Sequence, residues 1–384
     1  MIEKIIFMSF GSITTNLYES LCIDIFKKQG LEVDIIDLNN LFFNYDAPII
    51  KEYNIIVINS YKELEDYFIE NIKKSTIYNI QFNYETRFYK FFRLVTRYKC
   101  KVSKFEIGYH PTIEFNNNLR IIFKNPFKLI KRISEKIFDK IVFKTNIIKI
   151  NYTLRFVAGK KAYDIAKQSV TSNIIIINYI DYERYLELSS HNVSCIVEYK
   201  KYFVFLDSYL HMHEDNKFQS RSKDFNGEIY LKTLNKLFDY LETTYKVDII
   251  IAAHPKSNYT NNEFKHRKII KNNTANLVKN ADLVISDCST SISYCTLFYK
   301  PIMFCYTDDI IKYFNREYLY IKIFAKELNN KAINLDQDYS DFKLEEVNQE
   351  VYNKYKYNYL TSKESENYRN EEIVIKWLKN LISF

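Results

Sequence analysis

Short hydrophobic runs alternate with amphipathic stretches through the first half of the chain. The runs are rich in Ile, Val and Phe and end in polar segments, which is typical of buried strands. The stretches between them, such as YKELEDYFIENIKK, carry hydrophobic residues at helical spacing. Strands that alternate with helices of this length predict βαβ units and a parallel sheet. The predicted strands span residues 4–10, 31–38, 54–60, 76–82 and 173–180.

A second series of the same kind follows the irregular stretch 181–201. Its predicted strands span 202–208, 248–255, 282–287 and 301–307, with a long helix over about 226–245. A chain of 384 residues suits two domains of roughly 150–200 residues better than a single core. We therefore predict an α/β protein of two Rossmann-like domains facing across a cleft. The domains are residues 1–190 and 191–330, and a helical tail, 331–384, packs back on them.

Composition and charge narrow the classes of function. The formal net charge of +8 suits an acidic partner such as a nucleotide-sugar, a phosphate or an anionic membrane face. The pI near 8.8 and the lack of a familiar motif disfavour nucleic acid. Neither half carries a GxGxxG turn, which disfavours a dinucleotide dehydrogenase. The six cysteines form no CxxC pair, and no signal peptide or membrane-spanning run is visible, so we expect a cytoplasmic protein.

The strand DIIIAA ends abruptly in His254, Pro255 and Lys256. In open α/β sheets, ligands bind at the carboxyl ends of the strands. A histidine held by a following proline can donate to a phosphate oxygen, and Lys256 can add a positive charge there. The structural alternative is an ordinary exit from a strand, with a histidine that is hydrogen-bonded inside its loop.

A cluster of hydroxyl groups follows another predicted strand, DLVIS. Asp287 ends this strand, and Ser289, Thr290 and Ser291 stand where a helix is expected to begin. Capping of that helix accounts for one or two of these residues. Three successive hydroxyls at such a position favour phosphate binding instead. Because both strands belong to one predicted sheet, we expect His254 and this cluster to open on the same edge.

Asp207 directly follows the first strand of the second half, in the loop DSYLHMHEDN. It is interpreted as orienting His254, binding a ribose hydroxyl or acting as a base, and the sequence leaves these three roles open. The His-x-His in the same loop invites a metal site, which is disfavoured because no third ligand is identifiable. We therefore predict neither a metal nor a cofactor. Glu19, Asp207 and Glu114 are the candidate bases for deprotonating an acceptor hydroxyl.

A basic amphipathic helix is predicted over residues 124–140, with Phe127, Ile130, Ile133 and Ile137 at helical spacing and four basic residues between them. Such a helix can rest on an anionic membrane and bring an enzyme to a lipid-linked acceptor. The favoured alternative is a core helix with a basic face in water.

These motifs resemble the donor half of GT-B glycosyltransferases that build bacterial surface polysaccharides. Bacterial sialyltransferases of that fold carry a His-Pro motif, matched by His254–Pro255, and a Ser-Ser or Ser-Thr motif, matched by Ser289–Thr290 or Thr290–Ser291. The CDP-glycerol and CDP-ribitol polymerases of teichoic acid synthesis carry Asp-Tyr-Ser-Ser, to which the run from Asp287 to Thr290 is similar, with cysteine in place of tyrosine. The resemblance covers about residues 173–307.

The resemblance implies an inverting, metal-independent glycosyltransferase that moves a sugar from a nucleotide-sugar onto a glycan or lipid-linked glycan. The implied donor is a CMP-linked sialic acid or Kdo-like sugar. The sialyltransferases place an acid in an Asp-Asp/Glu-Gly motif, which this chain lacks, so the base stays unassigned. The alternatives are a CDP-polyol phosphotransferase, a UDP-sugar epimerase of the same fold, and a non-catalytic polysaccharide-binding or assembly protein. Peripheral contact with the cytoplasmic face of the inner membrane is a further expectation.

Overall fold

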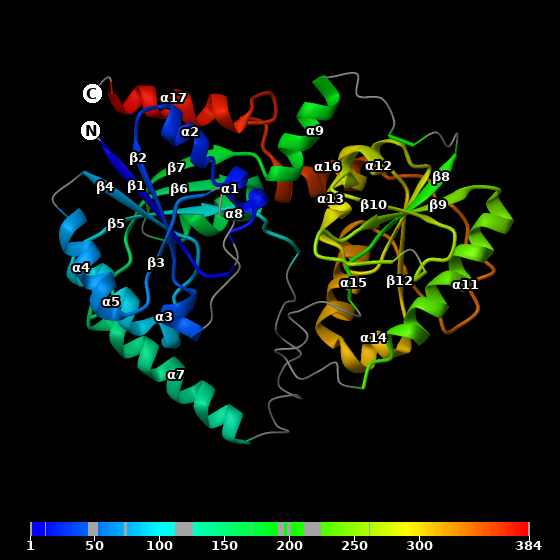
Figure 1. The fold of residues 1–384 in the computed structure, drawn as a ribbon, viewed down its shortest axis with the longest axis horizontal. Coiled ribbons are helices and arrows are strands. Elements are labelled where there is room, and N and C mark those ends of the chain that lie inside the picture. Colours follow the sequence, from blue (N-terminus) through cyan, green and yellow to red (C-terminus); the bar gives the residue numbers. More distant parts are fainter. Residues whose placement is uncertain are drawn as a thin grey trace. The chain divides into compact units, whose positions relative to one another are not determined.

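The structure is a computed structural model that describes residues 2–11, 13–44, 53–72, 75–111, 126–169, 171–190, 196–197, 201–210, 224–260 and 262–382. Two units are distinguished by their internal contacts (Figure 1). Unit 1 comprises Met1–Tyr109, Glu114–Ile180 and Thr361–Phe384, and unit 2 comprises His110–Ile113 and Asp181–Leu360. The end of the chain therefore belongs to the same unit as its beginning.

Unit 1 is built on a seven-stranded sheet with the order β3-β2-β1-β4-β5-β6-β7, and every pair is parallel. Every strand is short, and all but β5 are rich in β-branched or aromatic residues, as a sheet covered on both faces requires. The strands are β1 (Lys4–Ser9), β2 (Glu32–Asp37), β3 (Ile55–Val57), β4 (Thr76–Ile80), β5 (Lys101–Glu106), β6 (Tyr152–Ala158) and β7 (Thr171–Ile177).

Helices pack on both faces of this sheet. One face buries Phe68, Phe91 and Phe92 from α4 and α5, and the other buries Phe26 from α2 and Val374 from α17. Because alternate strand residues point to opposite faces, both hydrophobic cores draw on the same strands. The helices are α1 (Thr15–Ser20), α2 (Ile23–Lys28), α3 (Asn39–Phe43), α4 (Tyr61–Asn71), η1 (Thr86–Phe88), α5 (Tyr89–Arg97), α7 (Pro126–Lys144), α8 (Gly159–Lys167) and α17 (Asn370–Ile382).

Unit 2 is built on a six-stranded parallel sheet with the order β10-β9-β8-β11-β12-β13. Its strands are β8 (Tyr202–Leu206), β9 (Asp248–Ala253), β10 (Lys268–Lys271), β11 (Leu283–Ser286), β12 (Ile302–Tyr306) and β13 (Ala332–Asn334). The predicted α/β class with two Rossmann-like parallel sheets is confirmed. The first strand of each series lies inside its sheet, so the chain reverses its direction of travel across the sheet at that strand.

The helices of unit 2 cover its sheet in the same way, and Phe238 of α11 packs against Phe205 of β8 with ring centroids 5.3 Å apart. The helices are α9 (Ile180–Ser190), α11 (Gly227–Tyr245), α12 (Thr274–Asn280), η3 (Thr290–Ile292), α13 (Ser293–Leu297), α14 (Asp308–Tyr313), α15 (Asn315–Glu327), α16 (Gln349–Tyr355) and η4 (Lys356–Leu360).

Strand β5 was not predicted, because its sequence KVSKFE carries charged residues in the middle of the sheet. Lys104 and Glu106 are buried, together with Arg155 of β6. Glu106 accepts a hydrogen bond from Arg155 at 2.9 Å, and Lys104 lies 3.4 Å from the same carboxylate oxygen. Burial lowers the pKa of Lys104 from its usual value, and the charge of Glu106 opposes this shift. The charged side chains can be buried in this strand because they pair with each other in the folded state. The local sequence pattern does not show this pairing.

The segment predicted as a tail divides between the two units. β13 adds an edge strand to the sheet of unit 2, whereas α17 packs on the sheet of unit 1. Asn178 holds the returning chain, because its backbone N–H donates to Asn370 at 2.7 Å and its side-chain oxygen accepts from Thr361 at 2.6 Å. Hydrogen bonds that span more than 180 residues tie the last helix to unit 1.

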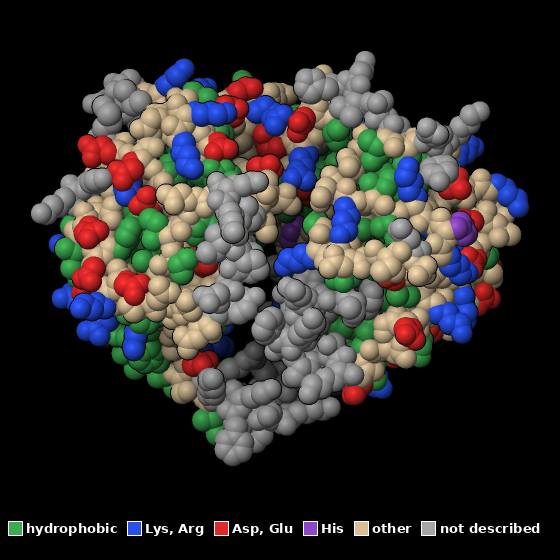
Figure 2. Space-filling view, in the orientation of Figure 1, with side chains coloured by type: hydrophobic (Ala, Val, Ile, Leu, Met, Phe, Trp, Pro, Cys, Tyr) green, Lys and Arg blue, Asp and Glu red, His purple; other side chains and the backbone are tan. Residues whose placement is uncertain are grey.

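Acidic and basic side chains are interspersed on both units in the face drawn in Figure 2. This mixture agrees with a modest net charge of +8 on 384 residues. Among the helices in the described ranges, none combines the length and the hydropathy that crossing a bilayer demands.

Candidate functional site

The candidate site lies at the carboxyl edge of the sheet in unit 2. β8, the first strand of this sheet, lies between β9 and β11, so the strand order reverses there. A crevice outside such a reversal is the usual ligand site of open α/β sheets. Neighbouring strands lie about 5 Å apart, which places the ends of β9 and β11 about 10 Å from each other. Asp207, His254 and Asp287 follow these three adjacent strands.

Asp207 is a buried carboxylate that organises the loops around it. Its Oδ1 accepts a hydrogen bond from the backbone of Tyr209 at 2.8 Å. Its Oδ2 accepts from the backbone of His254 at 3.1 Å and from the hydroxyl of Tyr259 at 3.0 Å. Of the three roles left open by the sequence, these contacts favour orientation of the His254 loop, because the oxygens are engaged by the loop itself.

His254 begins a tight turn. The backbone N–H of Ser257 donates to the carbonyl of His254 at 2.9 Å, with Pro255 at the second position of the turn. The backbone N–H of Lys256 donates to Nδ1 of the imidazole at 3.2 Å. A neutral ring that accepts at Nδ1 carries its proton on Nε2. The turn therefore sets the tautomer that makes Nε2 a donor, while Lys256 extends an exposed cation from the same loop.

Asp287 is the second buried carboxylate, at the end of β11. Its Oδ2 accepts hydrogen bonds from Ser208 at 2.6 Å and from Tyr230 of α11 at 2.9 Å, and its Oδ1 accepts from the backbone of Cys288 at 2.5 Å. Ser208 directly follows Asp207 in the chain. The loop after β8 is therefore linked to the loop after β9 through Asp207 and to the loop after β11 through Ser208.

Burial raises the pKa values of both carboxyl groups. The pKa of Asp207 rises to about 6, chiefly through desolvation and further through the negative charge of Asp287, while the donors from His254 and Tyr209 oppose the rise. The pKa of Asp287 is also raised by burial, and its hydrogen bonds from Ser208 and Tyr230 oppose this. Partial protonation of such a pair reduces the negative charge that an incoming anion would meet.

The raised pKa of Asp207 predicts a stability that depends on pH. The native state holds the proton up to about pH 6, whereas an exposed aspartate loses it near its usual pKa of 3.8. The contribution of Asp207 to stability should therefore fall by about 3 kcal/mol as the pH rises from about 4 to 6, in proportion to the difference between the two pKa values. Above pH 6 this contribution should stay constant. The variant Asp207→Asn should lack this dependence. The measurement is the difference between the unfolding midpoints of variant and wild type across this pH range.

The matched control is Asp248→Asn, which removes an exposed carboxylate at the start of β9. Its difference from the wild type at pH 4 and pH 7 serves as the baseline. A difference for Asp207→Asn that changes with pH no more than this baseline would contradict the raised pKa.

The hydroxyl cluster forms a short 3-10 turn rather than the start of a long helix. Ser289 caps η3 by accepting a hydrogen bond from the backbone of Ser291 at 3.3 Å. Thr290 is exposed and Ser291 is half-buried. Capping thus accounts for the side chain of Ser289, as the structural alternative expected for one or two of the three. Thr290 lies at the same sheet edge as His254.

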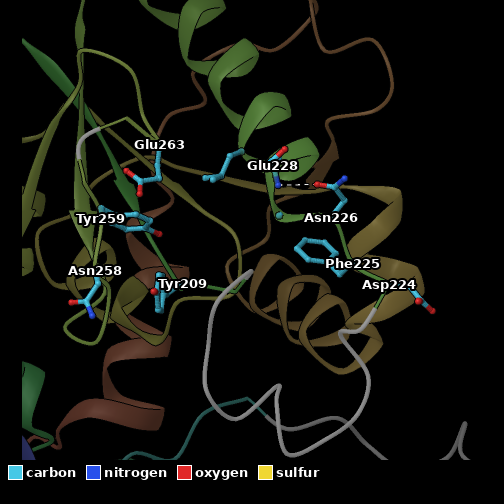
Figure 3. Close-up of a pocket in the computed structure, with 10 residues that line it drawn as sticks. Tyr209, Asp224, Phe225, Asn226, Glu228, Asn258, Tyr259 and Glu263 are labelled. Atoms are coloured by element: carbon cyan, nitrogen blue, oxygen red, sulfur yellow. Dashed lines mark hydrogen bonds between the residues drawn. The ribbon is translucent and has the colours of Figure 1, made fainter.

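A pocket of about 720 Å³ adjoins these loops (Figure 3). Tyr209 and Tyr259, both bound to Asp207, stand on one side of it, and Phe225 and the first turn of α11 stand on the other. The rings of Tyr209 and His254 are nearly parallel, with an angle of 8° and centroids 6.3 Å apart. The volume lies in the usual range for small-molecule sites. Its lining also includes Asp224, Asn226, Glu228, Asn258 and Glu263.

The predicted site residues of the second half all lie at this edge of the sheet: Asp207, His254, Lys256, Asp287, Ser289, Thr290 and Ser291. Hydrogen bonds join Asp207 directly to the backbone of His254, and Asp287 to the loop after β8. The sequence analysis missed Tyr230 and Tyr259, which hold the two carboxylates. Tyr259 lies five residues beyond His254, which is a local signal, whereas Tyr230 stands on α11 and no local pattern connects it with Asp287.

The first half of the chain contains two of the candidate bases, Glu19 and Glu114. In unit 1, Asn39 holds the loop after β1, accepting from the backbone of Gly11 at 2.8 Å, and Glu19 is exposed on α1. His110 belongs to unit 2, where its ring stands edge-on to Phe324 and burial lowers its pKa to about 4. Glu114 and the acidic and histidine residues 211–215 lie outside the described residues.

Comparisons with known proteins give a fold likeness only. Neither a family model nor a curated protein matches the chain. Solved structures that align with it include a UDP-GlcNAc 2-epimerase from Methanocaldococcus jannaschii, at 16% identity and TM-score 0.45 over 99% of this chain and 100% of that one. Spinosyn forosaminyltransferase SpnP aligns at 8% identity and TM-score 0.47 over 100% of both chains. A variant of the wall teichoic acid polymerase TagF aligns at 12% identity and TM-score 0.47, over 100% of this chain and 90% of that one. With TM-scores below 0.5, these likenesses assign no activity or site residue to this chain.

Proposed function

We propose that this protein is a glycosyltransferase of the GT-B class that uses a nucleotide-sugar donor held by unit 2. The observation that supports the proposal is the convergence of His254 and the Thr290–Ser291 hydroxyls on one sheet edge, around the strand at which the order reverses. Unit 1 contributes the contacts to a glycan or lipid-linked glycan acceptor. Peripheral contact with the cytoplasmic face of the inner membrane is part of the same proposal.

The donor phosphate is held by neutral donors and one cation. Nε2–H of His254, the ammonium of Lys256 and the hydroxyls of Thr290 and Ser291 supply hydrogen bonds and charge to the phosphate oxygens. Asp207 acts as a positioning residue, because it fixes the backbone of His254. Asp287 positions the loop before the hydroxyls, because its carboxylate accepts a hydrogen bond from the backbone N–H of Cys288.

The transfer is an inverting, metal-independent displacement. The acceptor hydroxyl oxygen forms a bond to the anomeric carbon, and the bond from that carbon to the phosphate oxygen breaks. The departing nucleotide keeps the electron pair, and the hydroxyl proton goes to a base that is not assigned. Negative charge grows on the phosphate during this step, so donors held ready by the His254 turn stabilise the transition state more than the ground state.

The donor that we favour is a CMP-linked acidic sugar, on the strength of the His-Pro and Ser-Thr motifs. Isothermal titration with CMP, CDP, UDP and GDP tests this choice. Selective binding of CMP supports it, and a preference for CDP favours polyol phosphate transfer. A preference for UDP favours the epimerase or another donor class. Absence of binding by all four nucleotides contradicts the proposal and favours an assembly role.

The double variant Thr290→Val with Ser291→Ala is expected to weaken nucleotide binding about 100-fold or more. Each lost hydrogen bond to a charged phosphate is worth about 1.5–3 kcal/mol, so the loss of two corresponds to at least about 3 kcal/mol. Titration of the preferred nucleotide measures the change. The control is Thr243→Val, an exposed threonine on α11. Equal affinities of wild type and double variant would show that these two hydroxyls do not bind the phosphate.

A further inference from the structure

Helix α7 presents a row of isoleucines to solvent. Ile130, Ile133, Ile137 and Ile141 are 63%, 49%, 55% and 53% exposed. Their spacing of three and four residues places them on one side of the helix, because an α-helix has 3.6 residues per turn. We call these four residues the isoleucine stripe. It contradicts the favoured interpretation of this segment as a core helix, since the residues expected in the core are outside it.

The acidic residues of the same helix are turned toward the protein. Asp139 accepts hydrogen bonds from the hydroxyls of Tyr84 at 2.8 Å and Thr86 at 3.0 Å. Val142 is buried in the core of unit 1 on the same side, and Glu135 is half-buried. This arrangement reverses the usual pattern of a surface helix, in which the hydrophobic side faces inward and the charges face water.

Exposed lysines accompany the isoleucine stripe. Lys136, Lys140 and Lys144 follow one another at four-residue intervals and are exposed. Counting 100° per residue, Lys136 and Lys140 lie beside the stripe and Lys144 lies within it. Hydrophobic and basic side chains reach the surface in the region of α7 in Figure 2. The outward side of the helix is therefore hydrophobic and positively charged at once.

We infer that α7 lies in the plane of an anionic lipid bilayer, with the isoleucine stripe among the acyl chains and the three lysines at the headgroups. Charge complementarity supports this occupant, because a lysine row beside a hydrophobic row is the pattern of helices that bind anionic membranes. Exposing four isoleucines to water is unfavourable, and transfer of these side chains into a bilayer removes that hydrophobic surface from water. This helix is the surface through which the membrane contact of the proposed function would be made. The inference rests on the proposed function only for the idea that the acceptor is lipid-linked.

Co-sedimentation of the full chain with vesicles tests the inference. Vesicles of phosphatidylcholine with 30% phosphatidylglycerol should bind the wild type at least ten-fold more strongly than pure phosphatidylcholine. Binding should weaken in 0.5 M salt, which screens the lysines. The variant Ile133→Gln with Ile137→Gln should lose at least ten-fold on both vesicles. The variant Lys136→Gln with Lys140→Gln should lose the preference for the anionic vesicle.

Each variant has a matched control on another helix. Ile69→Gln with Ile72→Gln replaces two isoleucines of α4 and its end that are 48% and 49% exposed. Lys232→Gln with Lys236→Gln replaces two exposed lysines one turn apart on α11. Both controls should bind vesicles as the wild type does. All variants should retain the wild-type thermal midpoint, because the replaced side chains are at least about half exposed or lie on the surface.

Three outcomes would overturn the inference: no vesicle binding by the wild type, equal loss in the controls, or wild-type binding by both α7 variants. A stable dimer in light scattering that Ile133→Gln with Ile137→Gln dissociates, without vesicle binding, would assign the stripe to a second copy instead. Nucleotide titration on the same variants separates this inference from the proposed function. Unchanged affinity with lost vesicle binding shows that the two are independent.

Discussion

Alanine in place of His254 is expected to reduce transfer at least 100-fold while the fold is retained. In the proposed site the imidazole supplies the Nε2–H donor to a phosphate on which charge develops, and removal of one such donor costs about 2.7–4 kcal/mol of transition-state stabilisation. The ring is half-buried at a loop, so little packing is lost. Turnover with the nucleotide-sugar chosen by titration measures the effect, and the thermal midpoint shows whether the fold is retained.

Two conservative variants separate the two nitrogens of the ring. In His254→Asn the side-chain oxygen can still accept from the backbone of Lys256, as Nδ1 does at 3.2 Å, but the outer donor is gone. In His254→Gln an amide N–H can reach the position of Nε2. We expect His254→Gln to retain more activity than His254→Asn. The reverse order would mean that the turn, rather than the donor, is what His254 supplies.

His266→Ala is the control, because this histidine of unit 2 has a side chain that is 73% exposed and lies 3.9 Å from Glu242. Its turnover should equal that of the wild type. If His254→Ala also turns over at the wild-type rate, the assigned role of His254 is wrong.

Alanine in place of Asp287 is expected to destabilise unit 2 by about 3–5 kcal/mol. Its carboxylate, in a residue that is 1% exposed, accepts from Ser208, Tyr230 and the backbone of Cys288, and alanine removes all three hydrogen bonds. A buried donor without a partner costs about 1–3 kcal/mol. Because the chain has two units, hydrogen exchange of peptides from β8 and β11 is the appropriate measurement.

Asp287→Asn keeps the shape of the side chain and is expected to cost about 1 kcal/mol or less. The amide oxygen can accept from the backbone of Cys288, and the amide N–H groups can donate to the hydroxyl oxygens of Ser208 and Tyr230, which accept as readily as they donate. The asparagine also removes a charge whose burial is unfavourable, as the raised pKa of Asp287 indicates. Equal exchange rates for the two variants would show that hydrogen bonding at Asp287 is not what stabilises the loop.

Much of the architecture follows from local patterns. The strands predicted at 202–208, 248–255 and 282–287 appear as Tyr202–Leu206, Asp248–Ala253 and Leu283–Ser286, each a few residues shorter than predicted. Runs of β-branched residues must be buried on both faces, and a parallel sheet covered by helices is the arrangement that does so. Because parallel strands end at the same edge, the sequence also predicted that His254 and the hydroxyl cluster after Asp287 would open on one edge of the sheet.

Only the tertiary structure decided which groups these residues bind. Tyr230 reaches Asp287 from a helix 57 positions earlier in the chain, and Asn178 holds Asn370 across 192 positions. Distant partners also decided which side of α7 packs against the rest of unit 1. Asp139 accepts hydrogen bonds from two hydroxyl groups on that side, and the isoleucines lie on the exposed side. Periodicity shows that a helix has two sides, but the free energy that selects the inner side comes from partners distant in sequence.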